Sequence, residues 1–111
     1  VFMLIDFTSI PVTTIPNMRG GEKEFRVHTY TDDMCRIMRG TLIPGASIGL
    51  HTHDTNSEII YILRGAGTLI CDGVREPVAV GSCHYCPKGH AHTFINDGDE
   101  DLEFFAVVPE Q

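Results

Sequence analysis

Hydrophobic and polar residues alternate in short runs along most of this chain, and glycine, proline or acidic residues separate the runs. Successive side chains of a β-strand point to opposite faces, so a repeat of two residues predicts strands rather than helices. Turn residues recur every eight to twelve positions or so, which is typical of a barrel or sandwich of short strands. The clearest predicted strands cover residues 24–30, 34–43, 58–63, 68–71, 74–80 and 102–108. The pattern therefore predicts an all-β fold.

The first 24 residues depart from this pattern. They contain Pro11, Pro16 and the pair Gly20–Gly21, which no regular helix would tolerate, and one short strand-like run, Val12–Ile15. A chain of 111 residues is long enough for one domain. We expect an N-terminal extended segment with a short strand over residues 1–24 and a barrel over residues 25–111.

The run that follows Glu58 is apolar on both of its faces. If Glu58 faces the interior, the alternate residues Ile59, Tyr61 and Leu63 face outward. An outward apolar face on a small barrel favours packing against a second sheet or a second subunit. We therefore expect a homodimer.

Composition narrows the classes of partner and compartment. The formal net charge is −7, and no cluster of lysine or arginine stands out, so nucleic acid and anionic membrane surfaces are not expected partners. The apolar run at the start, residues 1–6, is too short for a signal peptide or a membrane span. The four cysteines are then expected to be free thiols in a cytoplasmic protein.

Histidine and glutamate residues in the middle of the chain have the spacing of metal ligands. His51 and His53 are two residues apart, so in a strand their imidazoles point to the same side. The polar residues 54–57 predict a turn, after which Glu58 enters the next strand facing the same point. A further ligand is expected from His92, which follows the strand-breaking residues Pro87 and Gly89.

These two stretches resemble the two signature motifs of the cupin superfamily, and no signature position departs from the pattern. The residues that match the first motif are Gly45, His51, His53, Glu58 and Gly65. The residues that match the second motif are Gly81, Pro87, Gly89, His92 and Asn96. The resemblance implies a double-stranded β-helix, the cupin jelly-roll barrel, with a metal held by His51, His53, Glu58 and His92. It also selects His92 rather than His90 as the fourth ligand.

Three imidazoles and a carboxylate suit one divalent transition metal, namely Fe, Mn, Ni, Co, Cu or Zn. Such a set leaves coordination positions open for water or substrate, as a catalyst requires. The first hypothesis is a metalloenzyme that acts on a small, oxygenated and possibly anionic molecule, as a dioxygenase or as an isomerase or lyase, which are activities that the resemblance implies. The alternative is a module that binds or senses a small sugar or acid without turnover. No residue is identified as a catalytic acid or base.

Two arginines are candidates for binding an anionic substrate. Arg36 and Arg39 are an odd number of residues apart, so only one of them can face the interior of a regular strand. The planar guanidinium group suits a carboxylate or phosphate. The opposite possibility, that both arginines lie on the outside, stays open. The other residues expected to line the pocket are Gly49, Ile60, Ile62, His90 and Phe94.

The spacing Cys83-x-x-Cys86 occurs in redox and zinc proteins. Here the run between Gly81 and Pro87 predicts a strand, which would send the two sulfurs to opposite faces. On this interpretation Cys83 and Tyr85 share one face, and His84 and Cys86 share the other. The two cysteines are then expected to be small apolar fillers.

Overall fold

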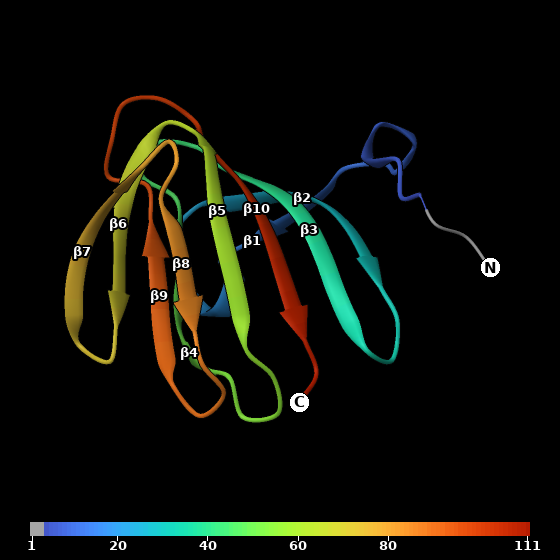
Figure 1. The fold of residues 1–111 in the computed structure, drawn as a ribbon. Helices are drawn as coiled ribbons and strands as arrows, with labels where there is room; N and C mark the ends of the chain where they lie inside the picture. The colour runs from blue at the N-terminus through green and yellow to red at the C-terminus, as the bar shows by residue number, and fades with distance from the viewer. Residues whose placement is uncertain (1–3) are drawn as a thin grey trace.

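The computed structural model describes residues 4–111; residues 1–3, which begin the predicted N-terminal segment and its apolar run, lie outside the described residues. The described chain forms short antiparallel strands and two single 3₁₀ turns, η1 (Phe7–Ser9) and η2 (Met18–Gly20) (Figure 1). The strands are β1 (Thr13–Pro16), β2 (Glu24–Thr31), β3 (Cys35–Leu42), β4 (Ser47–Thr52), β5 (Glu58–Arg64), β6 (Ala66–Cys71), β7 (Val74–Ala79), β8 (Cys83–Cys86), β9 (Ala91–Ile95) and β10 (Leu102–Pro109).

The strands form two sheets, and Figure 1 shows them as two layers. One sheet has the order β1-β2-β3-β10-β5-β8, and the other has the order β4-β9-β6-β7. Strand β1, which lies in the predicted N-terminal segment, pairs with β2 at the edge of the larger sheet. The prediction of an all-β jelly-roll barrel is confirmed.

The core between the sheets is built from inward-facing alternate residues and contains a cluster of aromatic rings. Phe25 and Phe104 stack with ring centroids 5.7 Å apart, and Phe94 meets Phe104 edge to face at 5.0 Å. Gly40 makes this packing possible, because a Cβ atom there would lie 2.5 Å from the Phe25 ring and 2.8 Å from the Phe104 ring. The rings close the interior beneath the candidate site.

Strands β6 and β7 are joined by a hairpin turn whose geometry follows from its two residues, Asp72 and Gly73. Asp72 and Gly73 have positive φ angles of 50° and 81°. A two-residue hairpin turn of type I′ requires positive φ at both positions, which asparagine, aspartate and glycine adopt most readily. The turn that the Asp72-Gly73 dipeptide predicts is therefore present, and it fixes the register in which Cys71 pairs with Val74.

Strand β5 divides its residues between the interior and the outer surface, as its alternation predicts. Glu58, Ile60 and Ile62 are buried. Ile59, Tyr61 and Leu63 are 39–44% exposed on the outer face. The homodimer expected from this apolar face stays a prediction, which the molar mass in solution, measured by light scattering, would check.

Candidate metal centre

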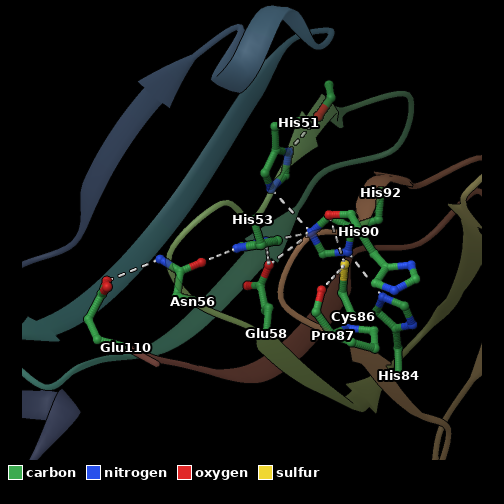
Figure 2. Close-up of polar contacts among 11 residues, drawn as sticks. His51, His53, Asn56, Glu58, His84, Cys86, Pro87, His90, His92 and Glu110 are labelled. Carbon is green, nitrogen blue, oxygen red and sulfur yellow. Dashed lines mark hydrogen bonds and ion pairs between the residues drawn. The ribbon is translucent and has the colours of Figure 1, made fainter.

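The four predicted ligands come from three strands and the loop between two of them. His51 lies near the end of β4, directly opposite His92 of β9, and Glu58 is the first residue of β5. His53 lies in the loop between β4 and β5. Nε2 of His92 is 3.1 Å from Nε2 of His51, 3.0 Å from Nε2 of His53 and 3.0 Å from a carboxylate oxygen of Glu58. The ligand atoms of all four residues lie within 4.8 Å of one another (Figure 2).

The other ring nitrogen of each histidine is held by a neighbour. Nδ1 of His51 bonds to the carbonyl oxygen of Gly49 at 2.8 Å, and Nδ1 of His53 bonds to the side-chain oxygen of Asn56. Nδ1 of His92 lies 3.0 Å from Nε2 of His84. Such contacts set the tautomer and orient the ring. With Nδ1 protonated in all three rings, the three Nε2 lone pairs converge on one point.

The loop that carries His53 is fastened at both ends. The backbone N–H of His53 donates to the carbonyl oxygen of His90, and the carbonyl oxygen of His53 accepts from the N–H of Gly89. The amide of Asn56 donates to Glu110, as Figure 2 shows, so the chain terminus supports the residue that orients His53. The site is therefore positioned before any ligand arrives.

Hydrogen bonds from two of the histidines keep the carboxyl group of Glu58 ionised. Burial opposes the charge of Glu58, but hydrogen bonds from His53 and His92 outweigh it, and the pKa of Glu58 falls to about 2. The bond to Glu58 in turn raises the pKa of His53, against the effect of burial. Glu58 is thus a carboxylate at all ordinary pH values, ready to bind a cation.

The donor set fits a divalent transition metal. Imidazole nitrogens and a carboxylate oxygen are ligands that Fe, Mn, Co, Ni, Cu and Zn accept, and they are too few to fill an octahedral sphere. His53, Glu58 and His92 are buried, whereas His51 is partly exposed at the open side. The residues present therefore fit the predicted cofactor.

The four ligands form one end of a cavity of about 330 Å³. Of the predicted pocket residues, Arg36, Ile60 and Phe94 line it. Arg36 shares the inward face of β3 with Met38. This agrees with the odd spacing between Arg36 and Arg39, which allows only one of the two arginines to face inward. The other lining residues are Met18, Arg19, Phe25, Met38, Ile48, Thr52, Asp54, Thr55, Asn56, Phe104 and Val108.

Arg39 lies outside the cavity, which corrects its inclusion among the pocket residues. Its guanidinium group bonds to Glu103 at 3.1 Å, on the face of the sheet that points away from the core. Arg64 bonds to the same carboxylate, also at 3.1 Å. Arg39 therefore serves as a surface residue, and Arg36 is the arginine of β3 that faces the site.

Three other pocket candidates also lie elsewhere. Gly49 lies beneath η2, where a Cβ atom would meet the carbonyl oxygen of Arg19 at 2.2 Å, so this glycine permits close approach of backbone. Ile62 faces inward and is buried like Ile60, but it does not line the cavity. His90 pairs with Asp72 and lies away from the cavity. The carbonyl oxygen of His90, rather than its ring, supports the site.

Sequence reasoning missed Arg19, Asn56 and His84. Arg19 lies in η2 with a positive φ of 55°, in a segment that the sequence predicts to be extended. In the sequence, only the Gly20–Gly21 pair beside Arg19 indicates that this segment packs closely against the barrel. Asn56 was assigned only to a turn. His84 shares its predicted face with Cys86, but nothing in the sequence shows that it contacts His92.

The spacing Cys83-x-x-Cys86 does not bring two sulfurs together. Cys83 is exposed and Cys86 is buried, because they leave opposite faces of β8. All four cysteines are free thiols. Within residues 4–111, no helix is both long and apolar enough to cross a membrane.

Stability of the metal-free protein is expected to fall as the pH is lowered from 6.5 toward 4. Burial, together with the neighbouring His92, lowers the pKa of His84 from 6.5 to about 4. Between these values the unfolded chain binds a proton at His84 that the folded chain does not, so acid favours unfolding. Burial also lowers the pKa of His51, which acts in the same direction, whereas the bond to Glu58 raises the pKa of His53, which acts in the opposite direction.

The ring of His84 is only half-buried, and solvent screening reduces its contribution to about 1 kcal/mol. This corresponds to a decrease of about 4 °C in the midpoint of thermal unfolding. Melting curves with a chelator at neutral pH and at about pH 5 would measure it. His84→Gln should show a smaller decrease than the parent; an identical decrease would contradict the assignment.

Comparison with known proteins agrees with this architecture. A family model described as a cupin domain matches residues 38–108. The oxalate-binding protein of Thermotoga maritima is 35% identical over 112 residues, which cover 96% of this chain and 93% of that protein. The crystal structure of a predicted oxalate decarboxylase from Thermotoga maritima has a TM-score of 0.92 at 34% identity and covers 98% of this chain and 100% of that one.

A sugar phosphate isomerase from Silicibacter pomeroyi, of the cupin superfamily, has a TM-score of 0.78 at 23% identity. It covers 98% of this chain and 76% of that one, and at this identity the likeness shows the fold alone. The family model, by contrast, covers more than half of the chain and includes all four predicted ligands. The chain belongs to the cupin family.

Proposed function

We propose that the protein binds one divalent transition metal at His51, His53, Glu58 and His92, and a small dicarboxylate of the oxalate class in the adjoining cavity. The observation that carries this proposal is that the cavity contains the four ligands together with two arginines. The names of the Thermotoga maritima protein and of the Thermotoga maritima crystal structure described above both refer to oxalate, which supports the ligand class.

Arg19 and Arg36 bring positive charge to the cavity from two different elements. Arg19 comes from η2, which packs against β4, and Arg36 comes from β3. The hydrogen bond to Glu58 is the main cause of the raised pKa of His53. The positive charge of Arg19 opposes this rise. A guanidinium group binds a carboxylate through two parallel hydrogen bonds. An anion in the cavity would therefore neutralise charge on both sides.

The size and the walls of the cavity favour a small ligand. Its volume of about 330 Å³ is at the lower end of the range for ligand pockets. Met38, Phe94, Phe104 and Val108 form an apolar wall that a charged group would avoid. A ligand with short carboxylates and little hydrocarbon fits this division between a charged end and an apolar end.

The metal, when bound, would supply a positive charge and open positions for carboxylate oxygens. The chain itself supplies the rest. His84, Gly49 and Asn56 keep the ligand rings in place, and Arg19 and Arg36 attract the anion. Residues 53–56 of the loop between β4 and β5 line the cavity.

Calorimetric titration of oxalate into the manganese-loaded protein tests the proposal. We expect binding that depends on the metal. Arg19→Ala and Arg36→Ala should each weaken it by ~10- to 100-fold, because a hydrogen bond to a charged group contributes about 1.5–3 kcal/mol.

Arg39→Ala is the matched control, since Arg39 is an exposed arginine that pairs with Glu103 on the outer face. It should bind oxalate like the parent. Equal affinity in all three variants would remove the arginines from the site. Absence of binding to the metal-loaded parent would show that the ligand class is wrong.

An enzymatic function in the same cavity is favoured by Asp54, a carboxyl group that lines it and is not among the four ligands. A group in that place can carry a proton to or from a bound acid, as a lyase reaction requires. Incubation with carbon-13 oxalate, followed by nuclear magnetic resonance, separates the alternatives. Formate and carbon dioxide in equal amounts would indicate a lyase. Two carbon dioxide molecules per oxalate, with no formate and with one dioxygen reduced to hydrogen peroxide, would indicate an oxidase instead. If oxalate at a saturating concentration stayed unchanged, the protein would bind oxalate without turnover.

A further inference from the structure

A second group of metal-binding side chains lies on the other side of His92. Cys71 of β6 is the cross-strand partner of His92, and Cys86 of β8 is the cross-strand partner of Glu58. Partners in register point their side chains to the same face. One ring nitrogen of His84 and the sulfurs of Cys71 and Cys86 all lie within 4.8 Å of one another.

We propose that Cys71, His84 and Cys86 form a second metal site, which takes thiophilic ions such as Zn²⁺ or Cu⁺. Two thiolates and an imidazole are a known ligand set for zinc with a fourth position open. Soft sulfur ligands also select Cu⁺ over the harder ions that suit a site of histidine and carboxylate. The two sites would therefore differ in the ions that they prefer, and this second site does not depend on the proposed oxalate function.

The surroundings of the cluster allow a metal to enter. Cys71 and His84 line a cavity of about 540 Å³, separate from the one that holds the first site. Glu76 also lines this cavity and brings negative charge to its mouth. Cys86 is fully buried behind them. An ion entering from this side would meet Cys71 and His84 first and could take its fourth ligand from water.

Charge and proton balance limit which ions can bind. A divalent ion that binds both sulfurs releases two protons, one from each thiol, and the two thiolates neutralise its charge. Burial, and next the neighbouring Cys71, raise the pKa of Cys86 to about 12, so only an ion with high affinity for thiolate can displace that proton. We accordingly expect no binding of Mg²⁺ or Mn²⁺ at this site.

The hydrogen bond between His84 and His92 links the two sites. When His84 binds a metal through its other nitrogen, the nitrogen that faces His92 carries the proton. His92 then keeps its own proton on the nitrogen that faces the first site. The first site is therefore best disabled in the test, and His51→Ala does this without touching Cys71, His84 or Cys86.

Cobalt is a suitable probe, because a thiolate–cobalt bond gives an intense near-ultraviolet charge-transfer band, and the first site contains no sulfur ligand. Co²⁺ would be titrated anaerobically, with a reductant, into the His51→Ala protein. We expect the band at one equivalent. Adding Cys71→Ser or Cys86→Ser should abolish it. Adding Cys83→Ser should leave it unchanged, because this exposed cysteine lines the same cavity but is not one of the three grouped residues.

Absence of the band in His51→Ala would overturn the proposal, and so would a band that survives Cys71→Ser. Cys71 is only partly buried, so Cys71→Ser tests the proposal even if Cys86→Ser fails to fold; circular dichroism would confirm the fold of each variant. Failure here and failure of the first site are distinguishable, because the first site binds Mn²⁺ without sulfur and the second gives a band that requires it.

Discussion

Replacing His92 with alanine is expected to abolish metal binding at the first site. Its Nε2 lies within 3.1 Å of ligand atoms of His51, His53 and Glu58, so it is the centre of the set. The affinity for Mn²⁺ should fall by more than ~100-fold, since even residues that merely support a metal ligand contribute ~10- to 100-fold. The stabilisation that a saturating metal gives the parent, ~2.7 kcal/mol at a hundred times its Kd, should disappear.

The metal-free protein should also be destabilised by His92→Ala. The ring is 1% exposed, and its removal leaves a cavity and takes one hydrogen-bond partner from the buried carboxylate of Glu58. We expect a loss of about 3 kcal/mol, or ~12 °C in the unfolding midpoint.

His90→Ala is the control for this experiment. His90 is only two residues away, but its ring is exposed and pairs with Asp72. The variant should keep its metal. Elemental analysis of the parent and both variants, purified from cells grown in a mixed-metal medium, would measure metal content. A full equivalent of metal retained by His92→Ala would refute the ligand assignment.

Asn96→Ala is expected to destabilise the fold without touching the metal. The Asn96 side chain is fully buried, and its amide nitrogen donates to the carbonyl oxygens of Leu42 and Glu100 at 2.7 and 2.8 Å. Its side-chain oxygen accepts the N–H of Gly98 at 3.0 Å. These bonds tie the loop between β9 and β10 to the end of β3. Their loss leaves buried backbone groups without partners, which costs about 3 kcal/mol or more.

Thermal unfolding should show a decrease of roughly 12 °C for Asn96→Ala. Asp99→Ala, a change at an exposed position of the same loop, should stay within about 0.5 kcal/mol of the parent. Below its midpoint, Asn96→Ala should bind Mn²⁺ like the parent. If the folded Asn96→Ala variant failed to bind Mn²⁺, Asn96 would support the metal ligands as well as the loop.

The clustering of the four residues proposed as metal ligands could be predicted because their arrangement is mostly local. His51 and His53 share a side through the two-residue period of a strand, and a polar turn brings Glu58 back to them. His92 is distant in sequence, and only the match to a known motif assigns it from the sequence. The same period correctly separated Arg36 from Arg39 and Cys83 from Cys86, but it could not say which member of each pair faces inward.

Two of the residues that were missed, Arg19 and His84, act across elements. Arg19 reaches the cavity because η2 packs on β4, where Gly49 leaves room for backbone. No periodic pattern in residues 1–24 predicts that contact. Ile62 is expected in the pocket because it shares a face with Glu58, and His90 because it is two residues from His92. The cavity is lined by neither of them, nor by Gly49.

The sequence by itself determined the strands, the Asp72-Gly73 turn and the shared side of His51, His53 and Glu58, because alternation and turn chemistry act over a few residues. His92 joins them through the motif resemblance. Only the tertiary structure decided that Arg19 joins the cavity, that His84 supports His92, and that Cys71 rather than Cys83 is the neighbour of Cys86. These contacts depend on which strands lie side by side and how the two sheets close. That arrangement is set by the packing of the whole core, which no short stretch of sequence contains.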